Sequence, residues 1–318
     1  MKSKIKTAVI GVGNMGKNHV RIYSLISDLV SIADVDEEIG RTIAKTYHTK
    51  YYKNYQEMLD RERIEAVSVV VPTPYHRQVV EVCLKHRIPT MVEKPIAGKV
   101  TDAQYLIRLS EEYKANLMVG HVERFNPAVI KLRQLIKEGK LGNIISIVSQ
   151  RVGISFPNIK NSNVLIDLGI HDVDVFNFLL NELPIRTKIV THKMFKNNQA
   201  DSASMILEYK NTCCLLQVNW ITPIKMRKLF VTGTDGFTEL DYIKQKIVMY
   251  DKIVEKKRDG NFFEFLSMYK HPKKEIYISR KEPLKEELIY FLESVSDGIK
   301  INSIHALEAL KIVISEKK

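Results

Sequence analysis

The stretch KTAVIGVGNMG, residues 6–16, passes from a short apolar run directly into a glycine pattern. Gly11, Gly13 and Gly16 have the spacing G-x-G-x-x-G, which is weak evidence alone because small glycine turns are common. Here it follows a strand-like run and opens a helix-like segment near 15–26, the context that a dinucleotide-binding fingerprint requires. The first glycine permits a tight turn, the second lets a diphosphate approach the backbone, and the third lets helix and strand pack closely. The phosphates are then expected at the helix N-terminus.

An acidic residue follows at the distance that this fingerprint needs. The apolar run LVSIAD ends at Asp34, 18 residues beyond Gly16. A carboxylate there accepts hydrogen bonds from ribose hydroxyls and repels a 2′-phosphate, which favours NAD over NADP. The alternative is that Asp34 or Asp36 merely caps the next helix. Asp36 stands directly before the periodic stretch EEIGRTIAKTY and is the better cap, so we expect Asp34 to be available for the ribose.

The pattern of apolar runs changes near residue 120. Before it, continuous runs of four to eight apolar residues alternate with amphipathic stretches, which indicates a doubly wound parallel sheet covered on both faces. After it, helices near 127–138 and 167–181 flank a strand, and a series of alternating strand candidates follows. The polar segment 251–282 is poorly periodic, and helices are expected near 284–298 and 303–315.

The predicted fold is therefore α/β with two domains. A Rossmann-type domain covers residues 1–120, and an α+β domain with a large, mostly antiparallel open sheet covers 121–318. The last helix, 303–315, could pack back on the first domain.

Composition narrows the class of protein. Forty-nine Lys and Arg against 37 Asp and Glu give a net charge of +12, and the dense patch at 252–258 is interleaved with Glu255. A solvated face is the favoured explanation, an anionic small substrate the second and nucleic acid a distant third.

Three cysteines, two of them adjacent, provide no disulfide framework or metal-ligand spacing. No run approaches the roughly 20 apolar residues of a membrane helix, and no signal peptide is legible, so the cytoplasm is expected.

The stretch VEKPIA, residues 92–97, places charges at the end of an apolar run. Lys94 would lie at the carboxyl end of a parallel strand, where open α/β sheets bind ligands. Pro95 confines the backbone of Lys94 to extended geometry, and the bond between them could be cis. Lys94 can then donate to a substrate hydroxyl, while Glu93 could hold the lysine in place. A solvated Glu-Lys pair is the competing interpretation, and the buried strand before it argues against that.

A polar stripe marks the helix predicted at 167–181. Asp167, His171 and Asp174 follow i, i+4, i+7 spacing, and the rest of the helix is apolar nearly all round. A satisfied core histidine is the ordinary explanation, and a metal bound by one histidine and two aspartates is a further alternative. We favour His171 as a general base, because imidazole titrates near neutral pH. Asp167 would orient it or contact the substrate, although Lys94 remains an alternative base.

The segment that crosses between the domains contains further candidates. Asn126 is a predicted helix N-cap with Pro127 at the first helical position. Arg124 is a candidate for an anionic diphosphate, because guanidinium binds phosphate in a fork. Arg151 and Arg227, both on predicted strands, are weaker candidates, and a surface location explains them equally well.

Four motifs together resemble one family. GVGNMGKNHVRIY, VVVPTPYH, VEKPIA and DLGIHDVDVF are similar to the motifs of the glucose–fructose oxidoreductase / inositol dehydrogenase (Gfo/Idh/MocA) family, and the resemblance runs through the whole chain. GHVERFNPAV and NWITPIKMRKLFVTG look most like its UDP-N-acetylglucosamine 3-dehydrogenase branch. Two departures are the segment 154–163, where a more basic sequence is expected, and His305 near the C-terminus.

The resemblance implies roles for particular residues. The cofactor-binding set is Gly11, Gly13, Asn14, Met15, Gly16, Asp34, Pro72, Thr73, His76, Glu93 and Lys94. The catalytic set is Lys94, His171 and Asp167, and the substrate set is Lys94, Arg124, Asn126, Arg151, Asp167 and His171.

The expected function is that of an NAD-dependent sugar dehydrogenase, and the branch implies oxidation at C3 of UDP-N-acetylglucosamine. The alternatives are an inositol or simple-sugar dehydrogenase and, in a different class, a non-catalytic nucleotide-binding regulator. No metal, nucleic acid or membrane partner is expected, and a homodimer or homotetramer is.

Overall fold

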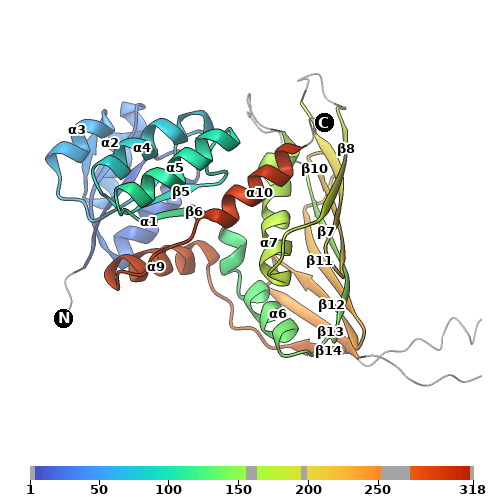
Figure 1. Ribbon diagram of the computed structural model, residues 1–318. Helices are drawn as coiled ribbons and strands as arrows, with labels where there is room; N and C mark the ends of the chain where they lie inside the picture. The colour runs from blue at the N-terminus through green and yellow to red at the C-terminus, as the bar shows by residue number, and fades with distance from the viewer. Residues whose placement is uncertain (1–3, 155–162, 195–198, 252–272, 316–318) are drawn as a thin grey trace, which may run out of the picture. The chain divides into compact units, whose positions relative to one another are not determined.

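The computed structural model describes residues 4–154, 163–194, 199–251 and 273–315 (Figure 1). It divides into two compact units, which are described separately. The first consists of Met1–Phe125 and Glu282–Lys311, and the second of Asn126–Lys281 and Ile312–Lys318. The basic patch at 252–258 and most of the segment 154–163 lie outside the described residues.

The first unit contains a six-stranded parallel sheet in the order β3-β2-β1-β4-β5-β6. The strands are β1 (Lys6–Ile10), β2 (Asp28–Ala33), β3 (Lys50–Tyr52), β4 (Ala66–Val69), β5 (Thr90–Glu93) and β6 (Leu117–Gly120). Every residue of β4 and β6 is buried, as expected for strands covered on both faces. This confirms the predicted doubly wound sheet, whose order reverses between β1 and β4.

Helices pack on this sheet. They are α1 (Gly16–Ile26), α2 (Glu37–Tyr47), α3 (Tyr55–Arg61), α4 (His76–Lys85), α5 (Val100–Glu112) and α9 (Pro283–Ser296), with the short 3-10 turns η1 (Thr73–Tyr75) and η2 (Val122–Phe125). Helix α1 lies beside α2 and α9, and α4 lies beside α5. Helix α3 and strand β3 were not predicted from the sequence, because both are too short for a clear hydrophobic period.

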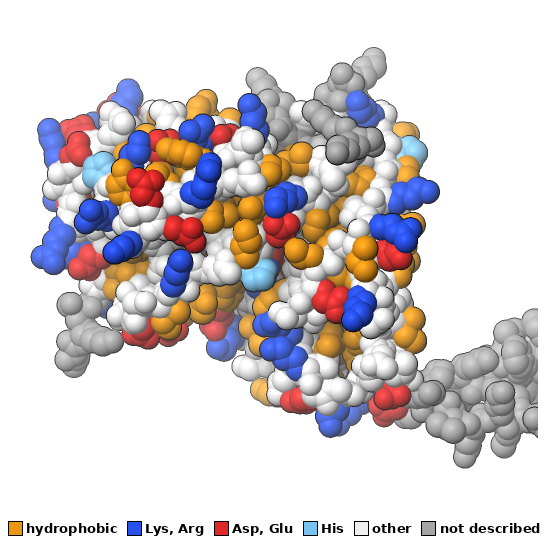
Figure 2. Space-filling model, in the orientation of Figure 1, with side chains coloured by type: hydrophobic (Ala, Val, Ile, Leu, Met, Phe, Trp, Pro, Cys, Tyr) orange, Lys and Arg blue, Asp and Glu red, His pale blue; other side chains and the backbone are white. Residues whose placement is uncertain are grey.

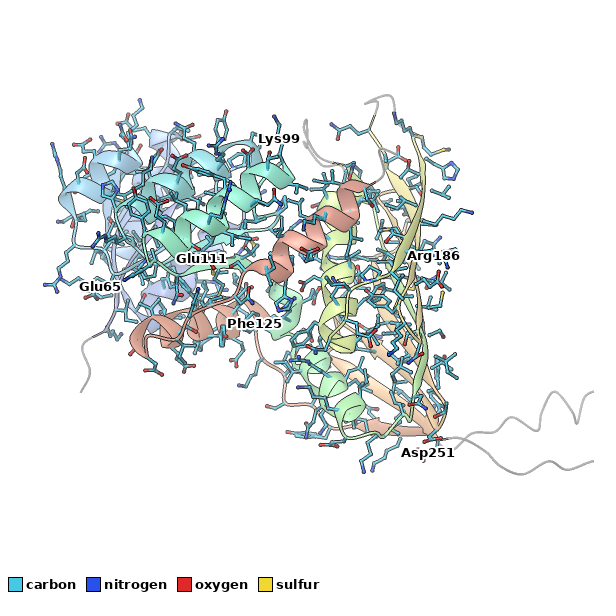
Figure 3. All side chains as sticks on the ribbon, in the orientation of Figure 1. Glu65, Lys99, Glu111, Phe125, Arg186 and Asp251 are labelled. Carbon is cyan, nitrogen blue, oxygen red and sulfur yellow. The ribbon has the colours of Figure 1, made fainter. Side chains whose placement is uncertain are left out.

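Helix α9 joins the first unit although it follows the second unit in sequence. Leu288 and Phe291 are fully buried in the core formed around α1 and the sheet. Phe125, labelled in Figure 3, packs its ring 5.5 Å from that of Tyr290 on α9. The chain therefore returns to the first unit after residue 281, and α10 (Ile304–Ile314) follows.

The second unit contains an eight-stranded sheet in the order β14-β13-β12-β11-β7-β10-β9-β8. The strands are β7 (Ile144–Val152), β8 (Arg186–His192), β9 (Ser202–Glu208), β10 (Cys213–Asn219), β11 (Met226–Gly233), β12 (Gly236–Asp241), β13 (Lys246–Asp251) and β14 (Lys273–Ile276). Among the described strands of this sheet, only β7 and β10 pair in parallel, which confirms the predicted mostly antiparallel sheet. Strand β14 falls in the segment 251–282, where no periodic pattern predicts it.

Two helices, α6 (Pro127–Lys137) and α7 (Ile170–Leu180), lie along one face of this sheet (Figure 1). Buried and exposed residues alternate along β9 and β10, as expected when only one face is covered. On the open face Ile206 and Leu215 are cross-strand partners, and both are more than a third exposed. This apolar pair is compatible with the expected homo-oligomer, which stays a prediction.

The helix predicted at 167–181 begins differently. Leu165–Gly169 form a π-helical turn, η3, and the α-helix starts only at Ile170. A π turn holds more residues than an α turn, so α-helical spacing does not relate Asp167 to His171. The π turn therefore changes the spacing on which the predicted stripe was based, and Asp174 is buried. A shared polar face of Asp167, His171 and Asp174 stays a prediction.

A buried ion pair joins α7 to the sheet. Arg151 Nε lies 2.5 Å from Asp172 Oδ2, and both side chains are almost fully enclosed. The Ser149 hydroxyl donates to the same carboxylate at 2.7 Å, and the Arg151 guanidinium lies 4.9 Å from the centre of the Tyr242 ring. Removing one partner of such a pair costs about 3–5 kcal/mol, because the other charge is left buried. Arg151 thus has a structural role, whereas its predicted contact with substrate stays a prediction.

The basic surplus is distributed on the visible surface. On the face drawn in Figure 2, Lys and Arg side chains are interspersed with Asp and Glu. In the described part of the chain, surface ion pairs include Arg41–Glu37, Arg61–Glu57 and Lys85–Glu81. Exposed pairs of this kind contribute little to stability, and their mixture of signs is typical of a solvated surface.

Candidate functional site

The glycine turn after β1 has the geometry that a dinucleotide needs. Gly11 has a φ of +88°, and a Cβ there would lie 2.7 Å from the Val70 carbonyl oxygen. A Cβ on Gly16 would lie 2.0 Å from the Gly11 carbonyl oxygen, which explains why the helix and turn require glycine there. A Cβ on Gly13 would meet no atom within 4 Å. The middle glycine therefore borders open space rather than protein.

Helix α1 begins immediately after this turn. Met15 occupies the N-cap position, its side chain makes no capping hydrogen bond, and the first helical turn contains no acidic residue. The N-terminal N–H groups of a helix attract anions. The residues present therefore fit a cofactor diphosphate, with Gly13, Asn14 and Met15 as the residues that would hold it. Their contact with the cofactor stays a prediction.

Asp34 follows β2, and its side chain contacts the backbone of the glycine turn. Its Oδ2 accepts the Val12 N–H at 2.7 Å, and its Oδ1 accepts the Asp36 N–H at 2.9 Å. Asp36 caps α2 through its own carboxylate, which accepts the Ile39 N–H at 3.0 Å. The prediction that Asp36, and not Asp34, caps α2 is therefore confirmed. Each Asp34 oxygen keeps a lone pair that can accept a ribose hydroxyl.

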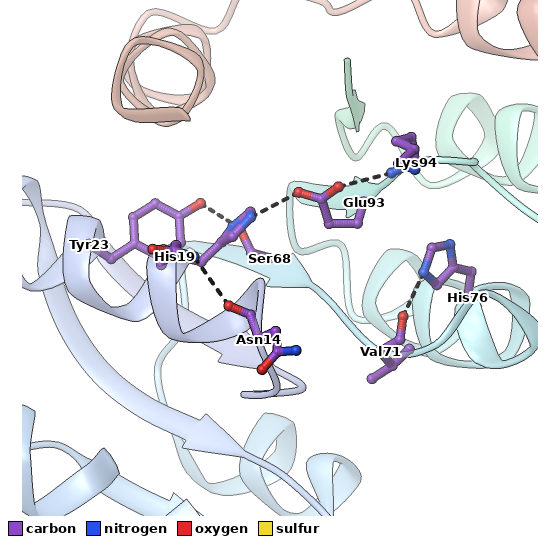
Figure 4. A network of polar contacts seen from close by, with 9 residues as sticks. Asn14, His19, Tyr23, Ser68, Val71, His76, Glu93 and Lys94 are labelled. Carbon is purple, nitrogen blue, oxygen red and sulfur yellow. Dashed lines mark hydrogen bonds and ion pairs between the residues drawn. The ribbon is translucent and has the colours of Figure 1, made fainter. Parts of the chain in front are cut away.

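The VEKPIA stretch lies at the carboxyl end of β5, as predicted, and the Lys94–Pro95 peptide bond is cis. Figure 4 shows the contacts that hold Glu93 there. Its Oε1 lies 3.0 Å from Nε2 of His19, and its Oε2 accepts the Lys94 N–H at 3.2 Å. Glu93 faces Gly120 across the β5–β6 ladder, and a Cβ on Gly120 would lie 3.3 Å from its carboxyl group. The absence of a side chain at Gly120 therefore makes room for the carboxylate.

Glu93 is held in its charged form. Burial raises the pKa of its carboxyl, but the hydrogen bond and charge of His19, the charge of Lys94 and the Lys94 N–H outweigh it, so the pKa of Glu93 lies below its usual range. The same carboxylate accepts the backbone N–H of Lys94 and so holds the main chain of that lysine in place. The strand end thus presents a lysine whose side chain can donate to a substrate oxygen.

The segment after β4 contains Pro72, then Thr73 at the start of η1 and His76 at the start of α4, and it contacts the same strand end. His76 is buried, with Nδ1 2.8 Å from the Pro95 carbonyl oxygen and Nε2 2.8 Å from that of Val71. Burial lowers the pKa of His76 more than these carbonyls raise it, so the ring is neutral at neutral pH and donates from one nitrogen. One ring nitrogen therefore donates to a backbone carbonyl of the protein, and the expected contact of His76 with the cofactor stays a prediction.

Asp167 and His171 belong to the second unit and are described within it. Asp167, in the π turn, accepts the indole N–H of Trp220 at 3.1 Å, and Trp220 itself is buried. His171 stands on the first turn of α7 and is half-buried. The neighbouring Asp172 faces the sheet and binds Arg151. Asp172 therefore has a structural role in α7, whereas Asp167 and His171 are the residues proposed to take part in the chemistry.

The crossing segment confirms the predicted cap. Asn126 accepts the Ala128 N–H at 3.1 Å at the start of α6, with Pro127 next, and its amide donates to the Tyr242 carbonyl at 3.1 Å. Both ends of this side chain are thus used inside the second unit. Arg124 is half-buried on η2 of the first unit. Arg227 lies opposite Arg151 in the β7–β11 register and so shares its face of the sheet.

Several residues of these arrangements were missed from the sequence. Four such residues lie inside the quoted motifs without having been singled out, and each acquires its role through a partner distant in the chain: His19, Gly120, Asp172 and Trp220. A weak signal existed for Asp172, because an acidic residue in a nearly all-apolar helix needs a partner.

Among the described residues, no group of three or more His, Cys, Asp or Glu is arranged to hold a metal ion. Within the same residues, no helix has both the length and the apolar character to cross a membrane.

Comparison with known proteins assigns the class. Residues 5–121 match the model of the oxidoreductase family with an NAD-binding Rossmann fold, and residues 129–239 match the Gfo/Idh/MocA C-terminal domain. The chain belongs to the Gfo/Idh/MocA family, and it is an oxidoreductase with an NAD-binding Rossmann domain.

Individual relatives are more distant. The UDP-N-acetylglucosamine 3-dehydrogenase of Acidithiobacillus ferrooxidans is 25% identical over 249 residues, covering 78% of this chain and 77% of that protein. Its solved structure superimposes with a TM-score of 0.86 at 21% identity, covering 98% of this chain and 96% of that one. Inositol 2-dehydrogenase 1 of Mycolicibacterium vanbaalenii is 31% identical over 194 residues, which is 59% of this chain and 57% of that protein.

The glycine turn predicts different outcomes for two alanine substitutions. Gly13→Ala adds a methyl group where no protein atom lies, so the fold should persist while NAD binds at least about tenfold more weakly. Gly16→Ala drives a Cβ into the Gly11 carbonyl, so it should lower the melting temperature of the protein without ligand. Calorimetric titration with NAD and thermal melts of both variants check this. Unchanged NAD affinity of Gly13→Ala would show that the cofactor does not approach this turn.

Proposed function

We propose that this protein is an NAD-dependent dehydrogenase that oxidises a ring hydroxyl of a sugar, at C3 of UDP-N-acetylglucosamine. The observation that carries the reaction class is the charged Glu93 next to Lys94 at the carboxyl end of β5. A protein that only binds a dinucleotide has no need of a buried carboxylate that fixes the backbone of a lysine at a strand end. Similarity to the UDP-N-acetylglucosamine 3-dehydrogenase over most of the chain supports the substrate.

In the proposed reaction, Lys94 donates a hydrogen bond to the oxygen of the reacting hydroxyl and stabilises the negative charge that develops on it. His171 accepts the hydroxyl proton, because imidazole titrates near neutral pH. Asp167 contacts the sugar or orients His171. NAD, when bound, supplies the acceptor for the hydride that leaves the same carbon.

The cofactor is proposed to be NAD rather than NADP because of Asp34. Its carboxylate is fixed by two backbone N–H groups, so it cannot turn away from a 2′-phosphate without losing both hydrogen bonds.

We expect Asp34→Ala to weaken NAD binding by about tenfold or more and to narrow the preference for NAD over NADP. Asp36→Ala is the matched control, because it removes only the cap of α2 and should lower stability by about 1 kcal/mol with the cofactor preference intact. The measurement is the dissociation constant of NAD and of NADP, by fluorescence, for the unsubstituted protein and both variants. The assignment is wrong if the unsubstituted protein binds NADP more tightly than NAD.

For catalysis, Lys94→Ala and His171→Ala should each lower kcat by about a hundredfold or more, because each removes a group that acts on the reacting hydroxyl. NAD binding should change little. Lys99→Ala and His192→Ala, at exposed positions of the same two units, serve as matched controls. Near-normal turnover by either test variant on the true substrate would remove that residue from the mechanism.

The charge of the candidate substrates distinguishes a nucleotide sugar from a free sugar. UDP-N-acetylglucosamine contains an anionic diphosphate, and Arg124 is the candidate to bind it in a fork, whereas free sugars have no charge to engage. Inositol dehydrogenation is the second candidate, and it is supported by the relative that is 31% identical over part of the chain.

We expect UDP-N-acetylglucosamine to reduce NAD far faster than N-acetylglucosamine or inositols do. Arg124→Ala should raise KM for the nucleotide sugar about tenfold with kcat little changed, because the diphosphate lies remote from C3 and contributes uniform binding. Arg108→Ala, exposed on α5, is the control. NADH absorbance is followed with the ketone trapped by an aminotransferase, since the equilibrium can oppose ketone formation. Equal activity on inositol or an uncharged sugar would contradict the nucleotide-sugar assignment.

A further inference from the structure

His19 is a buried histidine to which the proposed chemistry gives no role. It lies on the first turn of α1, three residues after Gly16, and its side chain has no exposed surface. Its Nε2 lies 3.0 Å from Glu93 Oε1 (Figure 4). Its Nδ1 is also buried, and has no hydrogen-bond partner among the described residues.

A packing role alone does not explain this residue. His19 makes an edge-on contact with the Tyr23 ring, 6.5 Å between centroids, which an apolar ring would make equally well. Burying an imidazole with one unsatisfied nitrogen costs free energy that a phenyl ring would avoid. The nitrogen that does have a partner meets a charged carboxylate, and hydrogen bonds to charged groups are among the stronger ones.

The contacts form a continuous path through the first unit. The His19 backbone N–H donates to the Met15 carbonyl oxygen at 3.3 Å, so His19 is part of the first helical turn after the glycines. Its ring reaches Glu93, and the other oxygen of Glu93 accepts the Lys94 N–H. The space for the carboxylate exists because Gly120 has no side chain. Two strand ends and one helix start are thus linked through a single carboxylate.

We infer that His19 is a positioning residue, which holds the Glu93 carboxylate and through it the main chain of Lys94 in a fixed place relative to the glycine turn. A lysine whose backbone is fixed has fewer directions available to its ammonium group, and correct placement of a reacting group contributes strongly to rate. The catalytic consequence rests on the proposed function, whereas the link between His19 and Lys94 does not.

The test measures hydrogen exchange at the Lys94 amide, by mass spectrometry, in the full chain with and without NAD. His19→Asn shortens the side chain so that it cannot reach Glu93, whereas His19→Gln can place an amide N–H near the position of Nε2. We expect exchange at Lys94 to become about tenfold faster in His19→Asn and to stay near normal in His19→Gln. NAD should slow this exchange in the unsubstituted protein and not in His19→Asn.

Tyr23→Phe is the matched control, because it lies one turn further along α1 and loses a buried hydrogen bond to Ser68 of 2.8 Å. It should lower the melting temperature as His19→Asn does and leave exchange at Lys94 unchanged. In steady-state assays, His19→Asn should lower kcat about tenfold with KM little changed, because positioning acts on the transition state.

The outcomes separate the inference from its alternatives. Equal effects of His19→Asn and His19→Gln, or unchanged exchange at Lys94 in His19→Asn, would overturn the positioning role. If His19→Asn does not fold, Glu93→Ala removes the carboxylate and so breaks the same link with His19 in place, and normal exchange at Lys94 in that variant would overturn the inference too. If exchange responds as expected but no sugar reduces NAD in the unsubstituted protein, the inference is supported and the proposed function fails.

Discussion

A single negative charge, buried at the carboxyl end of a parallel strand, constrains the first unit. Enclosing the Glu93 carboxylate costs free energy unless donors compensate it. The compensation comes from His19 on α1 and from the next backbone N–H, in a space that Gly120 leaves empty. The glycine turn, the end of β5 and the end of β6 must therefore be in register for the charge to be tolerated. A doubly wound sheet brings these strand ends to one edge.

The second unit satisfies a similar requirement with a different pair. Arg151 and Asp172 bury opposite charges between the sheet and α7, and Ser149 adds a hydrogen bond to the carboxylate. Because a buried pair is costly to break, it fixes which face of α7 meets the sheet. The π turn before α7 then presents Asp167 to Trp220. His171, between the two aspartates in sequence, keeps a half-buried position.

Short sequence patterns were sufficient to predict features that depend only on neighbouring residues. The G-x-G-x-x-G spacing, the acidic residue at Asp34, the cap at Asp36 and the cap at Asn126 follow from short-range geometry, and the structure has each in its expected place. The short elements β3, α3 and β14 were missed, because three to seven residues do not establish a period. The helix at 167–181 was found but its start was misread, since a π turn leaves no clear signal in an apolar sequence.

The amino-acid sequence by itself determined the class of fold, the position of the glycine turn, the strand that ends at Glu93 and Lys94, and the residues proposed to bind and react. The fold class, the glycine turn and the strand end follow from spacing along the chain, because local backbone geometry depends on it. The full sets of binding and reacting residues rest also on the resemblance to the family. Only the tertiary structure decided that His19 meets Glu93, that Gly120 makes room for it, and that Arg151 neutralises Asp172. Such pairs join residues that are 74 and 21 positions apart, and their partners are chosen by sheet order and helix packing rather than by any pattern along the chain.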